Sequence, residues 1–265
     1  MNRFDNRRIL VTGAGSGIGQ ATALRLLAEG GHVVAADVVP EGLAATRAQA
    51  AEAGLDAARL HTLVLDIASE PGVAAGVAEA VEVLGGLDVL VNAAGILRAA
   101  HTHQTSLDLW NRIVTVNLTG TFLVTREALP ALLATGRGVV VNFSSTSAAF
   151  AHPYMAAYAA SKGGVQAFTH ALALEYGKQG LRAVNVAPGS IKSGITDATG
   201  GYLPEDTDWS LFAKLSPILD TSVESASGAP MAGPETVAGV IAMLASDDGA
   251  FITGTEIRID GGTHA

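Results

Sequence analysis

The sequence predicts a doubly wound α/β fold, in which helices cover both faces of one parallel sheet of about seven strands. Short apolar runs typical of buried strands alternate with helical segments from Arg8 to Ile259. Their connections are short, which favours parallel strands joined by helical crossovers. The first strand leads directly into a glycine-rich turn. Because such crossovers are right-handed, we expect a ligand at the carboxyl ends of the strands.

Length and composition favour a single domain over residues 1–265. The chain has 265 residues, of which 49% are apolar and 15% charged, enough for a large buried core. Its formal charge of −9 offers no basic surface for nucleic acid. The absence of cysteine excludes disulfides and thiolate sites, and we expect no bound metal. With neither an export signal nor an apolar stretch of about 20 residues, we expect a cytoplasmic protein that does not enter a membrane.

Each predicted element follows from its residue pattern. Apolar, β-branched runs predict strands at residues 8–12, 32–36, 60–65, 87–91, 138–143, 181–187 and 256–259. Helical spacing predicts helices from the glycine-rich turn to about residue 29, and at residues 41–53, 70–84, 156–178 and 234–244. We expect residues 106–135 to form one long helix, with breaks before Leu109 and near Pro130.

The turn after the first strand, residues 13–19, has the composition of a phosphate-binding loop. Glycines at positions 13, 15, 17 and 19 let the backbone approach a pyrophosphate closely. The helix that follows presents free N–H groups and the positive end of its dipole at the same point. Such a glycine pattern is weak by itself, but its place between a strand and a helix favours dinucleotide binding.

Two acidic residues at strand ends predict how the dinucleotide is held. Asp37 follows Gly19 by 18 residues, where a carboxylate can accept hydrogen bonds from both ribose hydroxyls. It would repel a 2′-phosphate, and residues 14–18 and 38–40 hold no Arg or Lys to offset it, so we expect NAD rather than NADP. The alternative is that Asp37 caps the next helix. Asp66, at the end of the third strand, is placed to contact the adenine edge.

Tyr158 and Lys162 are candidates for acid–base chemistry. At i and i+4 they lie on one face of the predicted helix, about one turn apart. A Lys ammonium beside a phenol favours the phenolate, so we expect the Tyr158 pKa to fall below its ordinary value of about 10. Such a phenol can exchange a proton with an alcohol or ketone. The alternative is a surface Tyr beside a solvated Lys.

These signals occur in one order along the chain, together with several shorter motifs. They are Thr12-Gly13-x-x-x-Gly17-x-Gly19, Asp66, Asn92-Ala93-Ala94-Gly95, Asn117, Ser145, Tyr158-x-x-x-Lys162, Pro188-Gly189, Ile252-Thr253-Gly254 and Asp260-Gly261-Gly262. In this combination the chain resembles the short-chain dehydrogenase/reductase family from Arg8 to Gly262. It departs from the family pattern at Ala93, where a second Asn is usual, and at Lys192-Ser193, where an acidic residue and Thr are common.

The resemblance implies a Rossmann fold and a role for each site residue. Ser145 would hold the substrate oxygen, and Tyr158 would act as the acid/base. Lys162 would bind the nicotinamide ribose and favour the phenolate, while Asn117 would hold a water molecule of a proton relay. The implied cofactor-binding residues are Gly13, Ser16, Gly17, Ile18, Gly19, Asp37, Asp66, Ile67, Asn92, Ala93, Gly95, Tyr158, Lys162, Pro188, Gly189, Ile191 and Ser193.

Residues 190–233 interrupt the alternation of strands and helices. Pro, Gly, Ser and Asp are scattered among a few apolar residues, and a long irregular segment of this kind is often functional. We expect one or two short helices that form a lid over the substrate after the sixth strand. Trp209 and Phe212 belong either to the apolar face of that lid or to the core. His152 and Tyr154, which precede Tyr158, are candidates for the wall of the substrate pocket.

The predicted function is the NAD-dependent interconversion of a secondary alcohol and a ketone, with such a small molecule as the partner. Two alternatives stay open: a 3-oxoacyl-[acyl-carrier-protein] reductase that uses NADPH, and a catalytically silent protein that senses NAD(H). Asp37 disfavours NADPH, and the single base in residues 131–138, Arg137, is a poor surface for an acidic carrier protein. The resemblance also implies a homotetramer or homodimer, packed through the long helices at residues 106–135 and 156–178.

Overall fold

One parallel sheet of seven strands forms the centre of the protein in a computed structural model that describes residues 2–194, 200–219, 223–224 and 230–265. The strand order is β3-β2-β1-β4-β5-β6-β9, and all neighbouring strands run parallel. The order reverses between β1 and β4, which is where doubly wound sheets bind their ligands. The predicted fold class is therefore confirmed.

The strands occupy the apolar runs that the sequence indicates, with ends that differ by one or two residues. They are β1 (Arg8–Thr12), β2 (His32–Asp37), β3 (Leu60–Val64), β4 (Val89–Asn92), β5 (Val139–Phe143), β6 (Arg182–Pro188) and β9 (Glu256–Ile259). Successive residues face opposite layers, so that Ile9 and Val11 join one core cluster while Leu10 joins the other. Because both of their faces are buried, the inner strands are mostly apolar, whereas the edge strands β3 and β9 include polar residues such as His61 and Arg258.

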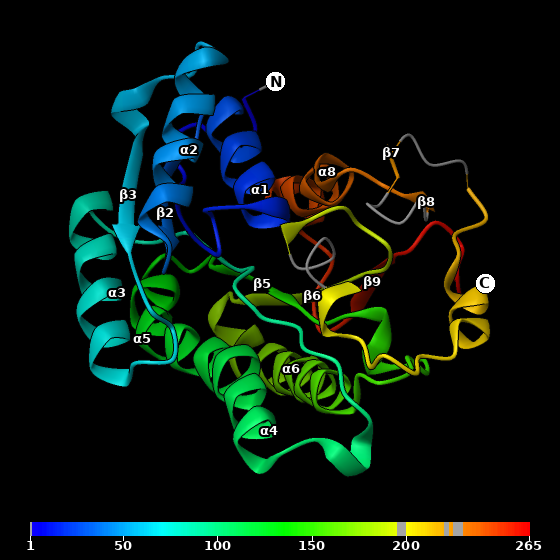
Figure 1. The fold of residues 1–265 in the computed structure, drawn as a ribbon. Helices are drawn as coiled ribbons and strands as arrows, with labels where there is room; N and C mark the ends of the chain where they lie inside the picture. Colours follow the sequence, from blue (N-terminus) through cyan, green and yellow to red (C-terminus); the bar gives the residue numbers. More distant parts are fainter. Residues whose placement is uncertain (1, 195–199, 220–222, 225–229) are drawn as a thin grey trace.

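Helices cover both faces of the sheet (Figure 1). The first layer consists of α1 (Gly17–Ala28), α2 (Pro40–Glu52) and α8 (Pro234–Ala245), and the second of α3 (Glu70–Leu84), α5 (Thr121–Ala134), α6 (Ala156–Tyr176) and α4 (Leu107–Val114), which packs on α6. Helix ends follow local chemistry. The Ser69 side chain accepts a hydrogen bond from the Gly72 amide at the start of α3, and Gly85 ends this helix in the left-handed conformation.

The segment predicted as one long helix, residues 106–135, is divided at a different place. A π-helical turn, Thr115–Gly120, joins α4 to α5, whereas Leu109 lies within α4 and Pro130 within α5. The predicted break points were therefore wrong. The widened turn directs the Asn117 side chain into the protein, where it is fully buried. A π turn holds one residue more than an α turn, and this shift by a single position was not recognised in the sequence pattern.

A row of buried polar side chains crosses β4, β5 and β6, near the carboxyl ends of β4 and β5 and at the middle of β6. Asn92, Asn142 and Asn185 are aligned by the strand register. Asn92 Nδ2 donates to Asn142 Oδ1 at 2.8 Å, and Asn142 Nδ2 donates to Thr169 Oγ1 of α6 at 2.8 Å. Thr169 Oγ1 also lies 3.0 Å from Asn185 Oδ1. A slipped register would leave these buried groups unpaired, so the row fixes the register of the three strands.

The segment predicted as a lid, residues 190–233, is described except at residues 195–199, 220–222 and 225–229. Its described part contains 3-10 turns at Gly200–Tyr202 and Trp209–Leu215, and a short antiparallel pair, β7 (Val223–Glu224) and β8 (Pro230–Met231). The expected short helices are thus tight 3-10 turns where the structure describes them. In the described residues, no helix combines the length and the apolar character needed to cross a membrane.

Candidate active site

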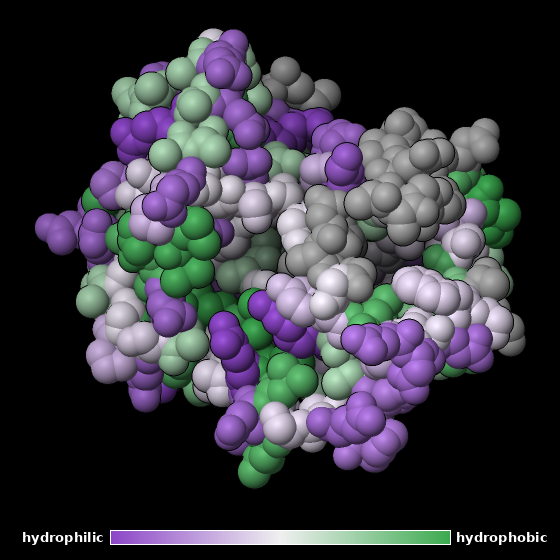
Figure 2. Space-filling view, in the orientation of Figure 1, coloured by the Kyte–Doolittle hydropathy of each residue, from purple (hydrophilic) through white to green (hydrophobic). Residues whose placement is uncertain are grey.

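A large cavity lies at the carboxyl ends of the strands, where the fold predicts a ligand. Its volume is about 1370 Å³, whereas pockets for single small molecules reach about 1000 Å³. The cavity therefore has room for a dinucleotide together with a substrate. Figure 2 shows the molecule hollowed near the centre of this face, with both hydrophobic and hydrophilic residues around the hollow.

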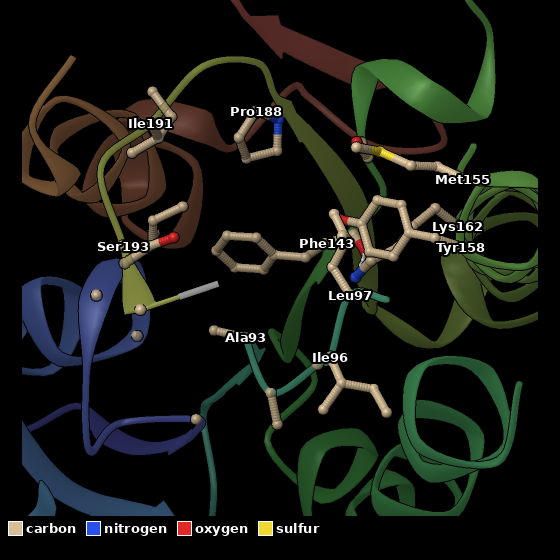
Figure 3. Close-up of a pocket in the computed structure, with 18 of the residues that line it drawn as sticks. Ala93, Ile96, Leu97, Phe143, Met155, Tyr158, Lys162, Pro188, Ile191 and Ser193 are labelled. Atoms are coloured by element: carbon tan, nitrogen blue, oxygen red, sulfur yellow. Dashed lines mark hydrogen bonds between the residues drawn. The ribbon is translucent and has the colours of Figure 1, made fainter. Parts of the chain in front are cut away.

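Most of the predicted site residues line this cavity. They are Gly13, Ser16, Gly17, Ile18, Gly19, Asp37, Asp66, Ile67, Ala93, Gly95, Ser145, Tyr158, Lys162, Pro188, Gly189, Ile191 and Ser193. Asn92 and Asn117 do not line it. The Asn92 side chain donates to Thr125 and Asn142 within the protein, so a direct contact of this side chain with the cofactor is not supported. In Figure 3, Tyr158 and Lys162 lie on one side of the cavity and face Ile191 and Ser193 across it.

The start of α1 fits a bound pyrophosphate. Ser16 precedes the helix without making a side-chain capping hydrogen bond, and the first turn holds no acidic residue. α3 differs, because Ser69 caps it and Glu70 follows. The N-terminus of α1 thus keeps its positive dipole end for an anion in the cavity. Gly13 has φ +70°, and a Cβ there would come within 2.7 Å of the Ala94 backbone, so this turn leaves no room for a side chain.

Asp37 and Asp66 are held in place by backbone donors at the cavity wall. Asp37 Oδ2 accepts a hydrogen bond from the Gly15 amide at 2.8 Å, and Oδ1 accepts one from the Val39 amide at 3.0 Å. Val39 is the N-cap of α2, so the alternative in which Asp37 caps that helix is not supported. Asp66 Oδ1 accepts from the Ala68 amide at 2.9 Å. Both carboxylates therefore have fixed orientations before any ligand binds.

Asn117 organises a polar network behind the cavity wall. Its Oδ1 accepts a hydrogen bond from the Ile96 amide at 2.8 Å, and its Nδ2 donates to the Ile96 carbonyl at 2.9 Å and to Ser161 Oγ at 3.1 Å. Gly95 fits between this side chain and Lys162, since a Cβ there would lie 3.2 Å from Asn117 Oδ1 and 3.6 Å from Lys162 Nζ. The network fixes the segment after β4 to α6. The role of Asn117 in a water relay stays a prediction.

Burial, more than mutual charge, sets the protonation of Lys162 and Tyr158. Lys162 Nζ donates to the Phe143 carbonyl at 2.9 Å and lies 5.8 Å from the centre of the Tyr158 ring. Burial lowers the pKa of Lys162 to about 8. Burial also raises the pKa of Tyr158, and the hydrogen bond with Ser145 opposes this only in part. The predicted fall of the Tyr158 pKa is therefore wrong, because desolvation outweighs the hydrogen bond with Ser145.

The two adjacent serines at the end of β5 point to different partners. Ser145 is hydrogen-bonded to Tyr158, and its Oγ accepts a hydrogen bond from the Ser147 amide at 3.2 Å. Ser144 Oγ instead donates to the Val186 carbonyl at 3.1 Å and contacts the Glu256 carboxylate. Only Ser145 of this pair is therefore arranged to share a substrate oxygen with Tyr158.

The substrate end of the cavity has apolar walls from several segments. Leu97 and Met155 belong to a small core cluster against which Leu203 and Phe212 of the lid pack. Trp209 and Phe212 both line the cavity, as does His152. Tyr154 is not among the lining residues of the described structure. It anchors the lid instead, since the Asp208 amide donates to its hydroxyl at 2.9 Å.

Sequence reasoning missed many of the lining residues, among them Thr263 and His264, which follow β9. Asp260 Oδ2 lies 3.0 Å from His264 Nδ1. An acid and a His four residues apart, directly after a strand, are the signal that could have revealed this pair. Within the described residues, no group of three or more His, Asp or Glu side chains could hold a metal ion.

Comparisons with known proteins agree with this geometry. The family model for short chain dehydrogenases matches residues 7–201. The chain is 38% identical over 263 residues to meso-2,3-butanediol dehydrogenase of Serratia marcescens, covering 99% of this chain and 96% of the relative. It is 34% identical over 261 residues to cyclohexanol dehydrogenase of Acinetobacter sp., covering 98% and 96%.

Two further similarities extend the comparison. A 2,5-dichloro-2,5-cyclohexadiene-1,4-diol dehydrogenase of Sphingobium indicum is 33% identical over 261 residues, which cover 98% of this chain and 97% of the relative. Among solved structures, levodione reductase superposes with a TM-score of 0.88 at 33% identity, covering 98% of both chains. These similarities span nearly the whole chain.

Proposed function

The chain belongs to the short-chain dehydrogenase family, and on that premise we propose that it interconverts a secondary alcohol and a ketone with NAD as its cofactor. It is an oxidoreductase whose relatives are dehydrogenases acting on small molecules. The single observation that carries the proposal is the shared cavity. Ser145, Tyr158 and Lys162 line the same space as the uncapped N-terminus of α1.

The residues of the chain would move one proton and hold one oxygen. A bound nicotinamide supplies or accepts the hydride. Ser145 and Tyr158, hydrogen-bonded to each other, would hold the substrate oxygen between their hydroxyl groups. Because its pKa is raised, Tyr158 is protonated at neutral pH and can donate to the oxygen of a ketone as negative charge develops there. Lys162, with a pKa near 8, is mostly charged at neutral pH and stabilises that charge.

Asp37 supports NAD over NADP. Its carboxylate lines the cavity at the end of β2 and is fixed by the Gly15 and Val39 amides. In that place it would accept hydrogen bonds from ribose hydroxyls and repel a 2′-phosphate. The neighbouring wall residues Val38 and Val39 are apolar and offer no cation to neutralise a phosphate.

Steady-state kinetics test the proposal directly. Purified protein is mixed with NAD or NADP and a panel of secondary alcohols, and formation of the reduced cofactor is followed by absorbance. We expect turnover with NAD and a lower kcat/KM with NADP. A preference for NADPH with 3-oxoacyl thioesters would favour the reductase alternative. Quenching of protein fluorescence by NADH without turnover on any substrate would favour the sensing alternative.

Exposed apolar side chains on α4, α5 and α6 support the proposed homodimer or homotetramer. Leu107 and Trp110 on α4 and Phe122 on α5 are exposed, and Phe122 packs edge-on against Phe168 of α6. Leu174, further along α6, is 87% exposed. Patches of this kind mark association surfaces more often than isolated exposed residues do. Light scattering at micromolar concentration tests the proposal, and a monomer would contradict it.

A further inference from the structure

Thr46 connects α2 to the glycine-rich turn, residues 13–19, from behind the cavity wall. Helices α1 and α2 lie side by side on one face of the sheet (Figure 1). Gly42, four residues before Thr46, lets α2 come close to the turn, since a Cβ there would lie 2.7 Å from the Gly15 carbonyl oxygen. Thr46 is fully buried and is not among the described residues that line the cavity. Its Oγ1 lies 2.7 Å from the Ala14 carbonyl oxygen.

The Ala14 carbonyl is the acceptor for the Thr46 hydroxyl proton. The Gly42 carbonyl oxygen also lies within reach, 3.0 Å from Thr46 Oγ1. That carbonyl belongs to α2, whose own hydrogen-bond ladder supplies it with an amide donor. The Ala14 carbonyl is nearer and has no other partner among the described residues. Because a buried acceptor without a donor is unfavourable, the hydroxyl donates to Ala14.

One peptide group of the turn is therefore held at both ends. The Ala14 carbonyl and the Gly15 amide belong to the same planar peptide and point in opposite directions. The carbonyl oxygen is bound by Thr46, and the amide donates to Asp37 Oδ2 at 2.8 Å. Gly15 has no side chain to restrict this peptide, and a Cβ there would lie 2.8 Å from Asp37 Cγ. The orientation of the peptide therefore depends on these two hydrogen bonds.

Gln20 of α1 supports the next peptide group and Thr46 itself. Its Nε2 lies 3.3 Å from the Gly15 carbonyl oxygen and 2.9 Å from Thr46 Oγ1. A carbonyl only accepts, so the side-chain amide of Gln20 must direct its NH₂ group toward both atoms. The Thr46 hydroxyl thus accepts a hydrogen bond from Gln20 while it donates to Ala14. These hydrogen bonds join α1 and α2 to the turn at the cavity wall.

The same peptide group orients the residue that we expect to select the cofactor. The Asp37 side chain lines the cavity, and its Oδ1 accepts from the Val39 amide, two residues later in the same segment. The Gly15 amide is the donor that comes from the glycine-rich turn, so it fixes Asp37 relative to that turn. If the peptide between Ala14 and Gly15 rotates, Asp37 loses this donor and with it the fixed orientation of its carboxylate.

We propose that Thr46 is a positioning residue for the cofactor. Through the peptide between Ala14 and Gly15, its hydroxyl holds Asp37 in the orientation that accepts ribose hydroxyls and repels a 2′-phosphate. Loss of the hydroxyl should weaken NADH binding and reduce the preference for NADH over NADPH, without changing the chemical step. This inference rests on the proposed function, because it assumes that a dinucleotide binds with its ribose at Asp37.

Fluorescence titrations of the ligand-free protein with NADH and with NADPH test the inference without relying on turnover. Thr46→Val keeps the shape of the side chain but removes the hydroxyl. We expect the Kd for NADH to rise about fivefold, and the ratio of the NADPH Kd to the NADH Kd to fall about threefold, as for one lost hydrogen bond. The kcat at saturating NAD should change by less than about twofold. A ratio that stays at the wild-type value would overturn the inference.

Two further variants separate positioning from a general loss of stability. Thr46→Ser retains the hydroxyl and should keep both Kd values within about twofold of wild type. Thr22→Val makes the same isosteric change at a fully buried threonine of α1 whose hydroxyl has no partner among the described residues, so the ratio should not change. A fall of the ratio in Thr22→Val as large as in Thr46→Val would contradict the proposal. Circular dichroism confirms that each variant is folded.

Gln20→Met gives a second measurement that does not depend on a fully buried position. Gln20 is half-buried, and Met has a similar length but removes the donor to Thr46 and to the Gly15 carbonyl. We expect the ratio to fall about twofold, in the same direction as in Thr46→Val. Gln49→Met removes an exposed partner of Gln20 on α2 and is the control. A ratio that rises or stays constant in Gln20→Met would contradict its supporting role.

A double-mutant cycle tests whether Thr46 acts through Asp37. In an Asp37→Ser protein the carboxylate that the peptide orients is gone. Adding Thr46→Val should therefore cause no further fall in the ratio of the two Kd values, because the two residues act as one unit. A further fall as large as in the single variant would show that Thr46 acts independently of Asp37, and would contradict the proposal.

The failure of this inference can be told apart from the failure of the proposed function. A wild-type protein that prefers NADH, with a ratio that Thr46→Val leaves unchanged, would refute only the role of Thr46. A wild-type protein that binds NADPH more tightly than NADH would refute the proposed cofactor, and the present inference with it. The expected Kd ratios in a protein that oxidises no secondary alcohol would support the inference and refute the proposed activity alone.

Discussion

The two ends of the cavity are built by different means. At the cofactor end the backbone dominates: the turn at residues 13–19 packs on the segment after β4, and the N-terminus of α1 is left without a side-chain cap. At the substrate end side chains dominate, and they come from α6, the lid and the turn after β9. Backbone geometry can be shared by many sequences, whereas a set of side chains distinguishes one chain from another. We therefore expect the backbone-built end to bind a cofactor common to many proteins, and the end built from side chains to select the substrate.

Tyr158→Phe should cause the largest loss of kcat. Because NADH binding should be retained, this variant also distinguishes the substrate end of the cavity from the cofactor end. Removing the hydroxyl removes the proton donor, so kcat should fall about a thousandfold. NADH binding, measured by fluorescence titration, should stay within about twofold of wild type. Tyr154→Phe is the matched control, since it removes a hydroxyl that binds the lid and does not line the cavity. Near-normal turnover in Tyr158→Phe would remove this residue from the mechanism.

Asp37→Ser tests the one side chain that we expect to set selectivity at the cofactor end. Loss of the carboxylate removes both the ribose acceptor and the repulsion of a 2′-phosphate. The ratio of kcat/KM for NAD over NADP should fall about 10- to 100-fold, as for a lost charged hydrogen bond. Asp56→Ser removes an exposed acid that caps a 3-10 turn and is the control. A ratio that stays constant would mean that Asp37 does not face the ribose.

Gly17→Ala tests whether the cofactor end depends on backbone shape. Gly17 has φ +53°, and a Cβ there would lie 2.9 Å from Ser193 Cβ. We expect the dissociation constant for NADH to rise about tenfold, because the left-handed strain of about 1–2 kcal/mol is joined by crowding. Gly54→Ala has a similar φ of +67° but nothing within 4 Å, so it should lose stability without losing NADH affinity. Equal NADH affinity in the two variants would contradict the prediction.

The pH dependence of ketone reduction should show the smallest effect. Lys162 has a pKa of about 8, lowered by burial, so it is charged below that pH and loses its proton above it. Tyr158, whose pKa is raised by burial, stays protonated throughout. The value of kcat/KM for NADH at saturating ketone, which reports the free enzyme, should be flat to pH 7, halved near pH 8 and lower beyond. A profile that stays flat to pH 9.5 would contradict this assignment.

The sequence anticipated the fold and the cofactor end better than the substrate end. Strand periodicity and the glycines at 13, 17 and 19 are local signals, and the structure places them as expected. Asn117 was found through the family resemblance, but its π turn has no local signature. The Tyr158 pKa was predicted with the wrong sign because burial depends on distant segments.

His264 shows most clearly what could not be predicted from the sequence alone. It reaches the cavity only because two glycines reverse the chain after β9 and because Asp260 holds the ring. The sequence analysis placed His152 at the pocket wall, but the path of the chain after β9, which brings His264 beside it, cannot be read from spacing along the chain. Long-range packing brings these residues together, and a pattern of short-range signals does not contain it.

The row of asparagines across β4, β5 and β6 gives the reacting groups a common reference level. Ser145 lies three residues beyond Asn142, after the end of β5, and Gly189 lies four residues beyond Asn185, directly after β6. The hydrogen bonds of this row hold β5 and β6 in one register, and that register also sets where the loops bearing Ser145 and Gly189 leave the sheet relative to each other.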